Sequence, residues 1–199
     1  MDFARFFPLL GVMGMALAGC ANVDAGFREL PQGRMATEPQ NYKLAEFNSL
    51  APETLTISDA NLYYPVADVV WRGDPFGDRL SQVEAIFDAA AEEAEGSLDG
   101  ARPVRATAQV TRFHSVTEKA RVSVGGVHSI RFYLTVYDRK TNELLEGPRL
   151  VIADLPALGG ENALASDREG DTMKTRITEH LKLVLVDELT GTTRAARPR

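Results

Sequence analysis

The sequence predicts an α+β domain in which two helices cover one face of a mixed four-stranded sheet, in the order β-α-β-β-β-α. Three observations lead to this two-layer sandwich. Residues 80–94 and 173–184 repeat apolar side chains every three or four positions, as amphipathic helices do. Residues 128–137 alternate between apolar and polar, which is typical of a strand with one buried face. Two helices and one apolar sheet face make two layers and leave the other sheet face open.

The first strand is expected at residues 54–58, where polar and apolar side chains alternate. The first helix follows Asp74, a good N-cap residue, and ends at Gly96. Asp78 is an alternative cap, because Gly77 is a poor residue for a helix interior. A right-handed crossover through this helix sets the first two strands parallel.

The second and third strands are predicted to pair as an antiparallel hairpin. The second strand places its small apolar residues between 104 and 110 on one face. A three-residue loop over 125–127 pairs Val124 with His128 and keeps the two apolar faces matched. His128 is then a half-buried strand residue, and His114 lies far from it along the ladder.

The remaining elements complete the sheet and its cover. A turn ends at Asn142, a residue that tolerates the left-handed conformation. The fourth strand spans about 143–153, and Pro148 places it at an edge or a bulge because proline cannot donate to a ladder. A long loop over 154–171 follows, and the last helix spans about 172–190.

The N-terminus reads as a secretory signal that closes on the only cysteine of the chain. Arg5 precedes the apolar run 6–18, which is too short to cross a bilayer. The sequence Leu-Ala-Gly-Cys at 17–20 resembles the bacterial lipoprotein signal. That resemblance implies cleavage between Gly19 and Cys20 and a diacylglycerol, often with a further palmitate, on the mature Cys20. An ordinary signal peptide with a free cysteine is the alternative.

The same resemblance implies a location and a domain plan. Lipoproteins retained in the inner membrane commonly carry Asp after the cysteine, so Ala21 implies the outer membrane, facing the periplasm. The plan is a signal peptide (1–19), a lipidated cysteine with a flexible tether (20–52), a periplasmic α+β domain (53–190) and a disordered basic tail (191–199). Two or more acyl chains anchor a protein stably to a membrane.

Composition excludes several function classes. The chain has 199 residues, a net charge of −6 and scattered basic residues, whereas nucleic-acid binding needs a basic stripe. After lipidation no thiol remains for a disulfide, a zinc ligand or catalysis. The three histidines lack metal-ligand spacing, and Asp154, Asp167, Glu169 and Asp171 match no calcium loop. We therefore predict no catalytic residue, no metal and no cofactor.

Two groups of side chains are candidates for binding a partner. Trp71 and Arg72 lie in the segment 63–78, which is rich in aromatic residues, proline and glycine. Trp, Tyr and Arg are enriched at binding hot spots, although such aromatics also cover the end of a core. The second group shares the polar face of the third strand, where a merely wet sheet surface is the alternative. Its members are Arg131, Tyr133 and Tyr137.

The strand pattern also resembles a known group of proteins. Residues 110–113, Gly125-Gly126 and 130–138 are similar to the β-hairpin core of uncharacterised proteobacterial envelope lipoproteins. The segments 71–75 and 78–79 resemble one such alphaproteobacterial family. The resemblance implies a domain of unknown function and supplies no catalytic residues.

We therefore expect a non-enzymatic, membrane-anchored lipoprotein whose periplasmic domain binds another cell-envelope component, in an adaptor or assembly role. The alternative is a periplasmic carrier of a lipid or apolar small molecule, which requires an apolar cavity. A hydrolase with an unconventional site is the third hypothesis and requires a cleft with a perturbed acid or base.

Overall fold

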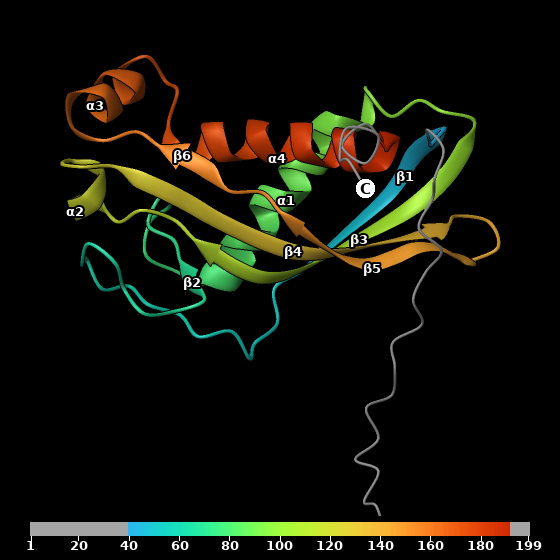
Figure 1. The fold of residues 1–199 in the computed structure, drawn as a ribbon, viewed down its shortest axis with the longest axis horizontal. Helices are drawn as coiled ribbons and strands as arrows, with labels where there is room; N and C mark the ends of the chain where they lie inside the picture. The colour runs from blue at the N-terminus through green and yellow to red at the C-terminus, as the bar shows by residue number, and fades with distance from the viewer. Residues whose placement is uncertain (1–39, 192–199) are drawn as a thin grey trace, which may run out of the picture.

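The computed structural model describes residues 40–191 (Figure 1). The expected signal peptide, Gly19, Cys20 and the basic tail beyond residue 191 lie outside these residues. The elements are β1 (Tyr42–Leu50), β2 (Val69–Val70), α1 (Arg79–Glu95), β3 (Arg102–His114), α2 (Glu118–Arg121), β4 (Gly126–Asp138), β5 (Leu144–Ile152), β6 (Leu155–Ala157), α3 (Gly160–Arg168) and α4 (Met173–Thr190).

The predicted α+β sandwich is confirmed. The sheet follows the order β1-β3-β4-β5, with β2 pairing β3 and β6 pairing β4. β1 and β2 run parallel to β3, whereas β4 is antiparallel to β3, β5 and β6. The long helices α1 and α4 lie together on one side of the sheet (Figure 1). A parallel pairing across α1 is found as expected, although it joins β3 to β1 and β2 rather than to residues 54–58. Six strand segments occupy four positions across the sheet.

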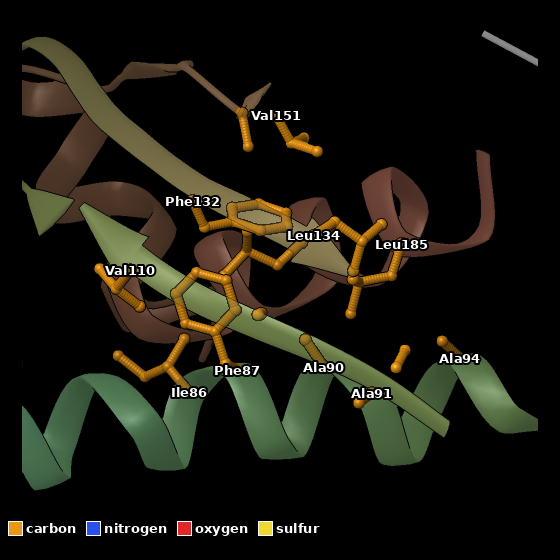
Figure 2. Packing of buried hydrophobic residues seen from close by; sticks show 14 of the residues in the cluster. Ile86, Phe87, Ala90, Ala91, Ala94, Val110, Phe132, Leu134, Val151 and Leu185 are labelled. Atoms are coloured by element: carbon orange, nitrogen blue, oxygen red, sulfur yellow. The ribbon is translucent and has the colours of Figure 1, made fainter. Parts of the chain in front are cut away.

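The core lies between this helix layer and the sheet (Figure 2). Phe87 of α1 meets Phe132 of β4 edge to face, with ring centroids 5.2 Å apart. Leu185 of α4 is fully buried in the same cluster. Burying a side chain of this size stabilises the fold by roughly 1.5–3 kcal/mol. The apolar stripes recognised in the sequence are thus the contacts that hold the two layers together.

The first helix begins at the alternative cap. The side chain of Asp78 accepts hydrogen bonds from the backbone N–H groups of Leu80 and Ser81, and Gly96 ends the helix as predicted. Asp74 instead accepts hydrogen bonds from Trp71 and Lys174. The expectation that Asp74 caps the helix is wrong, because its carboxylate joins two segments of the tertiary structure.

The expected tether is wrong over residues 42–50, which form β1. Tyr42 and Leu44 are buried against the helix layer, and the strand pairs parallel with β3. A register shift between Leu44 and Glu46 breaks the two-residue period that marks a strand. The segment 54–58, where the first strand was expected, contributes only an isolated bridge from Ile57 to Val69.

The predicted antiparallel pairing of the second and third strands is confirmed by β3 and β4, but the three-residue loop between them is wrong. β3 ends at His114, and helix α2, capped by Thr117, lies between it and β4. Val124 therefore does not pair with His128; His114 pairs with Ser129 instead. This register brings His114 and His128 to neighbouring positions at one end of the sheet, and His128 is fully buried rather than half-buried.

The second half of the chain confirms the fourth strand and the last helix. β5 is an edge strand with register shifts beside Pro148, and Asn142 has φ 58°. The loop expected over 154–171 is wrong, because it contains β6 and α3. Gly160, at φ 57°, lets the chain turn from β6 into α3.

Candidate functional site

The open face of the sheet carries the candidate site. On β4 the side chains alternate strictly, so Arg131 and Tyr133 point away from the helices while Phe132 between them is buried. Tyr137 lies on the same open face and is half-buried. The placement of Arg131, Tyr133 and Tyr137 on one surface is confirmed, because a period of two fixes the face of every residue in a regular strand.

Neighbouring strands add apolar side chains to this face. Tyr133 lies between Gln109 of β3 and Leu150 of β5, and Leu50 of β1 pairs with Gln109 on the far side. Ile152 lies opposite Arg131. We call four of these residues the sheet-face strip, and each is between 42% and 58% exposed: Leu50, Tyr133, Leu150 and Ile152.

Sequence analysis missed three members of the strip. Leu150 and Ile152 flank the buried Val151, and this alternation is visible in the sequence. Leu50 lies in the strand that the bulge concealed. These side chains lie beside Tyr133 only because of the order of the strands in the sheet. The alternation within a single strand does not reveal that order, so it could not predict the surface.

Two arginines lie on the open face, Arg105 and Arg131, although the whole chain carries a net charge of −6. Arg131 is exposed and makes no side-chain hydrogen bond or ion pair within residues 40–191. Arg105 donates to Asn142 Oδ1 at 2.5 Å, and its guanidinium lies 4.5 Å from the centroid of the Tyr137 ring. Neither Arg105 nor Arg131 forms an ion pair within residues 40–191; Glu46, which lies opposite Arg105 on β1, pairs with Arg139. The surface therefore suits a partner that combines apolar groups with negative charge.

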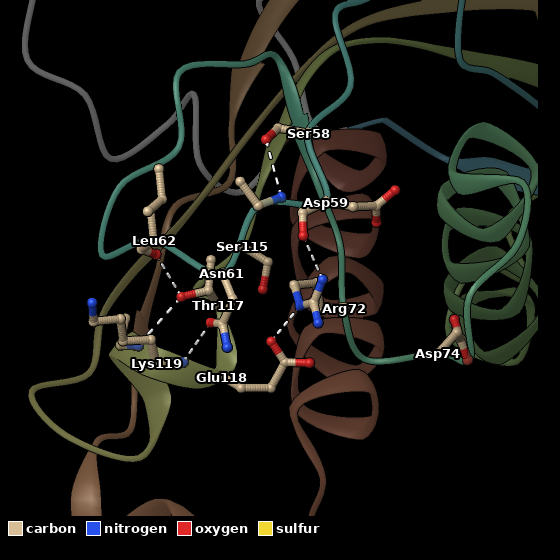
Figure 3. A network of polar contacts seen from close by, with 12 residues as sticks. Ser58, Asp59, Asn61, Leu62, Arg72, Asp74, Ser115, Thr117, Glu118 and Lys119 are labelled. Atoms are coloured by element: carbon tan, nitrogen blue, oxygen red, sulfur yellow. Dashed lines mark hydrogen bonds and ion pairs between the residues drawn. The ribbon is translucent and has the colours of Figure 1, made fainter.

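The other two candidates for partner binding lie elsewhere, and neither is an exposed anchor. Trp71 is fully buried, meets Phe113 edge to face at 5.6 Å and donates its Nε1–H to Asp74 at 2.8 Å. Arg72 is half-buried and bonds Glu118 and the carbonyl oxygen of Asp59 (Figure 3). Trp71 belongs to the core, as the alternative interpretation expected, so it is not an exposed docking residue. Arg72 fastens a loop to α2, and its role in docking stays a prediction.

A buried Ser–His pair lies at the α2 end of the sheet. Ser115 Oγ is 2.8 Å from His128 Nδ1 and 3.2 Å from Met173 Sδ. Burial lowers the pKa of His128 to about 4, and the charges of Arg176 and His180 add to this effect. A histidine of such low pKa is a weak general base near neutral pH, and Ser115 is itself buried. The pair therefore fits a structural polar contact.

The pocket beside this pair is small. It is lined by His128, Arg121, Met173 and Arg176 among others, and its cavity volume is about 20 Å³. That volume holds a water molecule rather than an acyl chain. The carboxylates near it have internal partners: Asp167 pairs with Arg121, and Asp171 accepts from Ser166.

No group of three or more His, Cys, Asp or Glu side chains within the described range is arranged to hold a metal ion. Asp154, one of the carboxylates considered for a cation, accepts a hydrogen bond from the backbone N–H of Ile130. Between residues 40 and 191 there is also no helix with the length and apolar character needed to cross a bilayer.

Comparison with known proteins gives a family and distant structural similarity. Among solved structures, a crystal structure of a Xanthomonas campestris protein of the DUF330 family is similar at 13% identity, covering 83% of this chain and 95% of that one, with a TM-score of 0.46. An uncharacterised protein is similar at 13% identity, covering 83% and 99%, with a TM-score of 0.36. No curated protein matches the sequence. A family of unknown function, DUF6778, matches residues 42–199, from the first residue of β1 onward, and the chain belongs to that family.

Proposed function

We propose that this chain is a lipid-anchored protein of the bacterial outer membrane whose periplasmic domain binds another envelope protein through the open face of its sheet. The observation that carries the proposal is the combination of the sheet-face strip with the unpaired Arg131. Exposed aromatic and aliphatic side chains around an arginine without a counter-ion have the composition of a binding hot spot.

The chemistry of this face defines the partner. Tyr133, Leu150 and Ile152 offer apolar area on a rigid sheet, so little ordering entropy is lost on binding. Arg131 and Arg105 offer two positive charges that form no ion pair within the described range 40–191, and Glu46, opposite Arg105, pairs with Arg139. The partner therefore presents an apolar surface flanked by carboxylates.

The membrane anchor is tested separately. Cells producing the full chain are labelled with palmitate, and we expect label on the wild type and none on Cys20→Ser. Persistent label on the Cys20→Ser variant would contradict lipidation at Cys20 without bearing on the sheet face.

Partner binding is tested by native mass spectrometry of the lipidated protein, isolated from its own membranes in mild detergent. We expect one identified acidic protein to be recovered with the wild type and to be lost from Arg131→Glu and Tyr133→Ala. The matched control is Leu183→Ser, which alters an equally exposed leucine on α4. Equal recovery with all variants would show that the open face is not the binding surface.

A further inference from the structure

An exposed apolar loop tip lies between β1 and β2, at the α2 end of the sheet, and Tyr64 connects it through Arg112 to the strand position beside Arg131. We define the loop tip by four side chains, which are between 54% and 96% exposed: Leu62, Tyr63, Tyr64 and Val66. The loop that carries them extends below the sheet at the α2 end (Figure 1). Val66 has almost no protein cover, which is an unfavourable position for an aliphatic side chain in water.

The backbone of this loop is firmly held (Figure 3). Thr117 Oγ1 donates to the carbonyl oxygen of Leu62 at 2.7 Å. The side chain of Asn61 accepts from the backbone N–H of Lys119 at 2.8 Å. The guanidinium of Arg72 donates to the carbonyl oxygen of Asp59 at 2.5 Å. These bonds fix the segment that leads into the tip, residues 59–62, to α2 and to Arg72.

A second group of contacts fixes the side of the tip nearest β3. His114 Nε2 lies 2.8 Å from the carbonyl oxygen of Pro65, and both residues are buried. The ring of Tyr64 stacks on the ring of His114 at 4.5 Å, and its hydroxyl accepts from Arg112 at 2.8 Å. The apolar side chains are thus presented in one defined arrangement, so ordering them costs little when they bind.

The charges around the tip are mostly positive or neutralised. Lys119 Nζ lies 4.8 Å from the centroid of the Tyr63 ring and has no carboxylate partner in the described part of the chain. Glu118 is paired with Arg72, and Asp59 is paired with Arg79. An anionic group that approaches the loop tip therefore meets two cations that form no ion pair in the described part of the chain: Lys119 beside Tyr63, and Arg112, which donates to the Tyr64 hydroxyl.

We propose that the loop tip inserts into the interfacial region of a phospholipid bilayer. Leu62 and Val66 enter the boundary of the acyl chains, and the two tyrosines lie at the level of the headgroups, where their amphipathic rings are favoured. Lys119 faces the lipid phosphates. A projecting tip with two tyrosines, two aliphatic side chains and one free ammonium fits a lipid surface better than a flat protein surface.

If Cys20 is anchored in a membrane as proposed, the chain that follows it is long enough for the loop tip to contact the same membrane. Residues 20–39 span at most about 70 Å when fully extended. The long strand β3, which runs from the tether end toward the loop tip, has 13 residues and a length of about 43 Å. The same membrane that holds Cys20 can therefore also contact the tip. This setting rests on the proposed anchoring, whereas the affinity of the tip for lipid does not.

The test measures co-sedimentation of the mature chain carrying Cys20→Ser with vesicles of phosphatidylethanolamine and a minority of phosphatidylglycerol. We expect the chain to bind these vesicles. The double variant Leu62→Ser/Val66→Ser removes two insertable side chains and lowers the partition coefficient about tenfold or more. Lys119→Gln gives a smaller reduction and a weaker dependence on salt.

The controls separate this proposal from the first one. Leu183→Ser and Tyr133→Ala change exposed residues outside the loop tip without altering the net charge and should leave vesicle binding unchanged. Thermal unfolding of each variant checks that the fold is intact. No binding by the parent chain, or equal binding by the double variant, would overturn the proposal. A photo-crosslinker at position 66 that labels a protein in cells, and no lipid, would also overturn it and assign the tip to a protein partner.

Discussion

The two faces of the sheet are built from the same strands and differ in what covers them. On β4 the side chains of Ile130, Phe132 and Leu134 are fully buried under α1 and α4, whereas Arg131 and Tyr133 between them are exposed. The covered face holds the fold together through close packing. The open face contributes little to that packing, so its apolar strip and unpaired arginine are better explained by recognition than by stability.

The largest expected effect contrasts a covered tryptophan with an exposed tyrosine. Trp71→Ala removes a fully buried ring and its hydrogen bond to Asp74, so it should lower the free energy of unfolding by about 3–5 kcal/mol. Tyr133→Ala should lower it by less than about 1 kcal/mol. Urea unfolding followed by circular dichroism measures both. Similar losses for the two variants would contradict the distinction between core and open face.

The next effect is a dependence of the free energy of unfolding on pH, caused by a histidine that is buried on the covered face of the sheet. Burial lowers the pKa of His128 from 6.5 to about 4, so the folded state binds fewer protons than the unfolded state between these values. The contribution of neutral His128 to the free energy of unfolding is fully present above pH 6.5. It falls by about 3 kcal/mol as the pH drops to 4. Burial also lowers the pKa of His180, which acts in the same direction.

Urea unfolding at a series of pH values tests this dependence. His128→Asn keeps a polar atom near Ser115 and removes the titrating ring, so its stability should vary much less between pH 6.5 and 5. The carboxylates whose pKa values are lowered, Asp138 among them at about 2, act at lower pH and leave this window clear. An unchanged slope in the variant would assign the dependence to other groups.

A smaller effect is expected at the start of α1. Asp78→Ala removes the side-chain acceptor for two backbone N–H groups and should cost about 1 kcal/mol. Asp78→Asn retains an acceptor and should cost less. Asp74→Asn should not reproduce the loss of the cap, because Asp74 bonds Trp71 and Lys174 instead. Thermal unfolding of the three variants distinguishes the two aspartates.

The smallest effect on stability belongs to the open face itself. Arg131→Glu replaces an exposed side chain without a partner, so the free energy of unfolding should change by less than about 0.5 kcal/mol. The same change should abolish recovery of the proposed acidic partner. A large loss of stability would instead give Arg131 a structural role and weaken the comparison between the faces.

Local patterns in the sequence predicted the parts of the fold that depend on one regular element. The alternation in β4 placed Arg131, Tyr133 and Tyr137 correctly, and the apolar stripes located α1 and α4. β1 was missed because the bulge after Leu44 breaks its alternation. α2 was missed because a short helix capped by Thr117 has too few residues to show a period.

The candidate site was predictable only in part, because it is assembled across strands. Leu50, Leu150 and Ile152 join Tyr133 through the strand order β1-β3-β4-β5, which no local pattern specifies. Trp71 was misplaced for the same reason: the aromatic residues near it in the sequence, Tyr63, Tyr64 and Phe76, are exposed, while Phe113, which packs against it, is far along the chain. Contacts between distant parts of the chain therefore explain both why three residues of the strip were not predicted and why Trp71 was wrongly included.

The most direct test of the open face places a photo-crosslinking amino acid at Leu150 or, as a control, at Leu183, in the full chain in intact cells. We predict that position 150 yields a single envelope protein whose crosslinked peptide combines apolar residues with carboxylates, that Arg131→Glu suppresses this adduct, and that position 183 does not give it. The same adduct from position 183, or an adduct at position 150 that is insensitive to Arg131→Glu, would contradict recognition through the open sheet face.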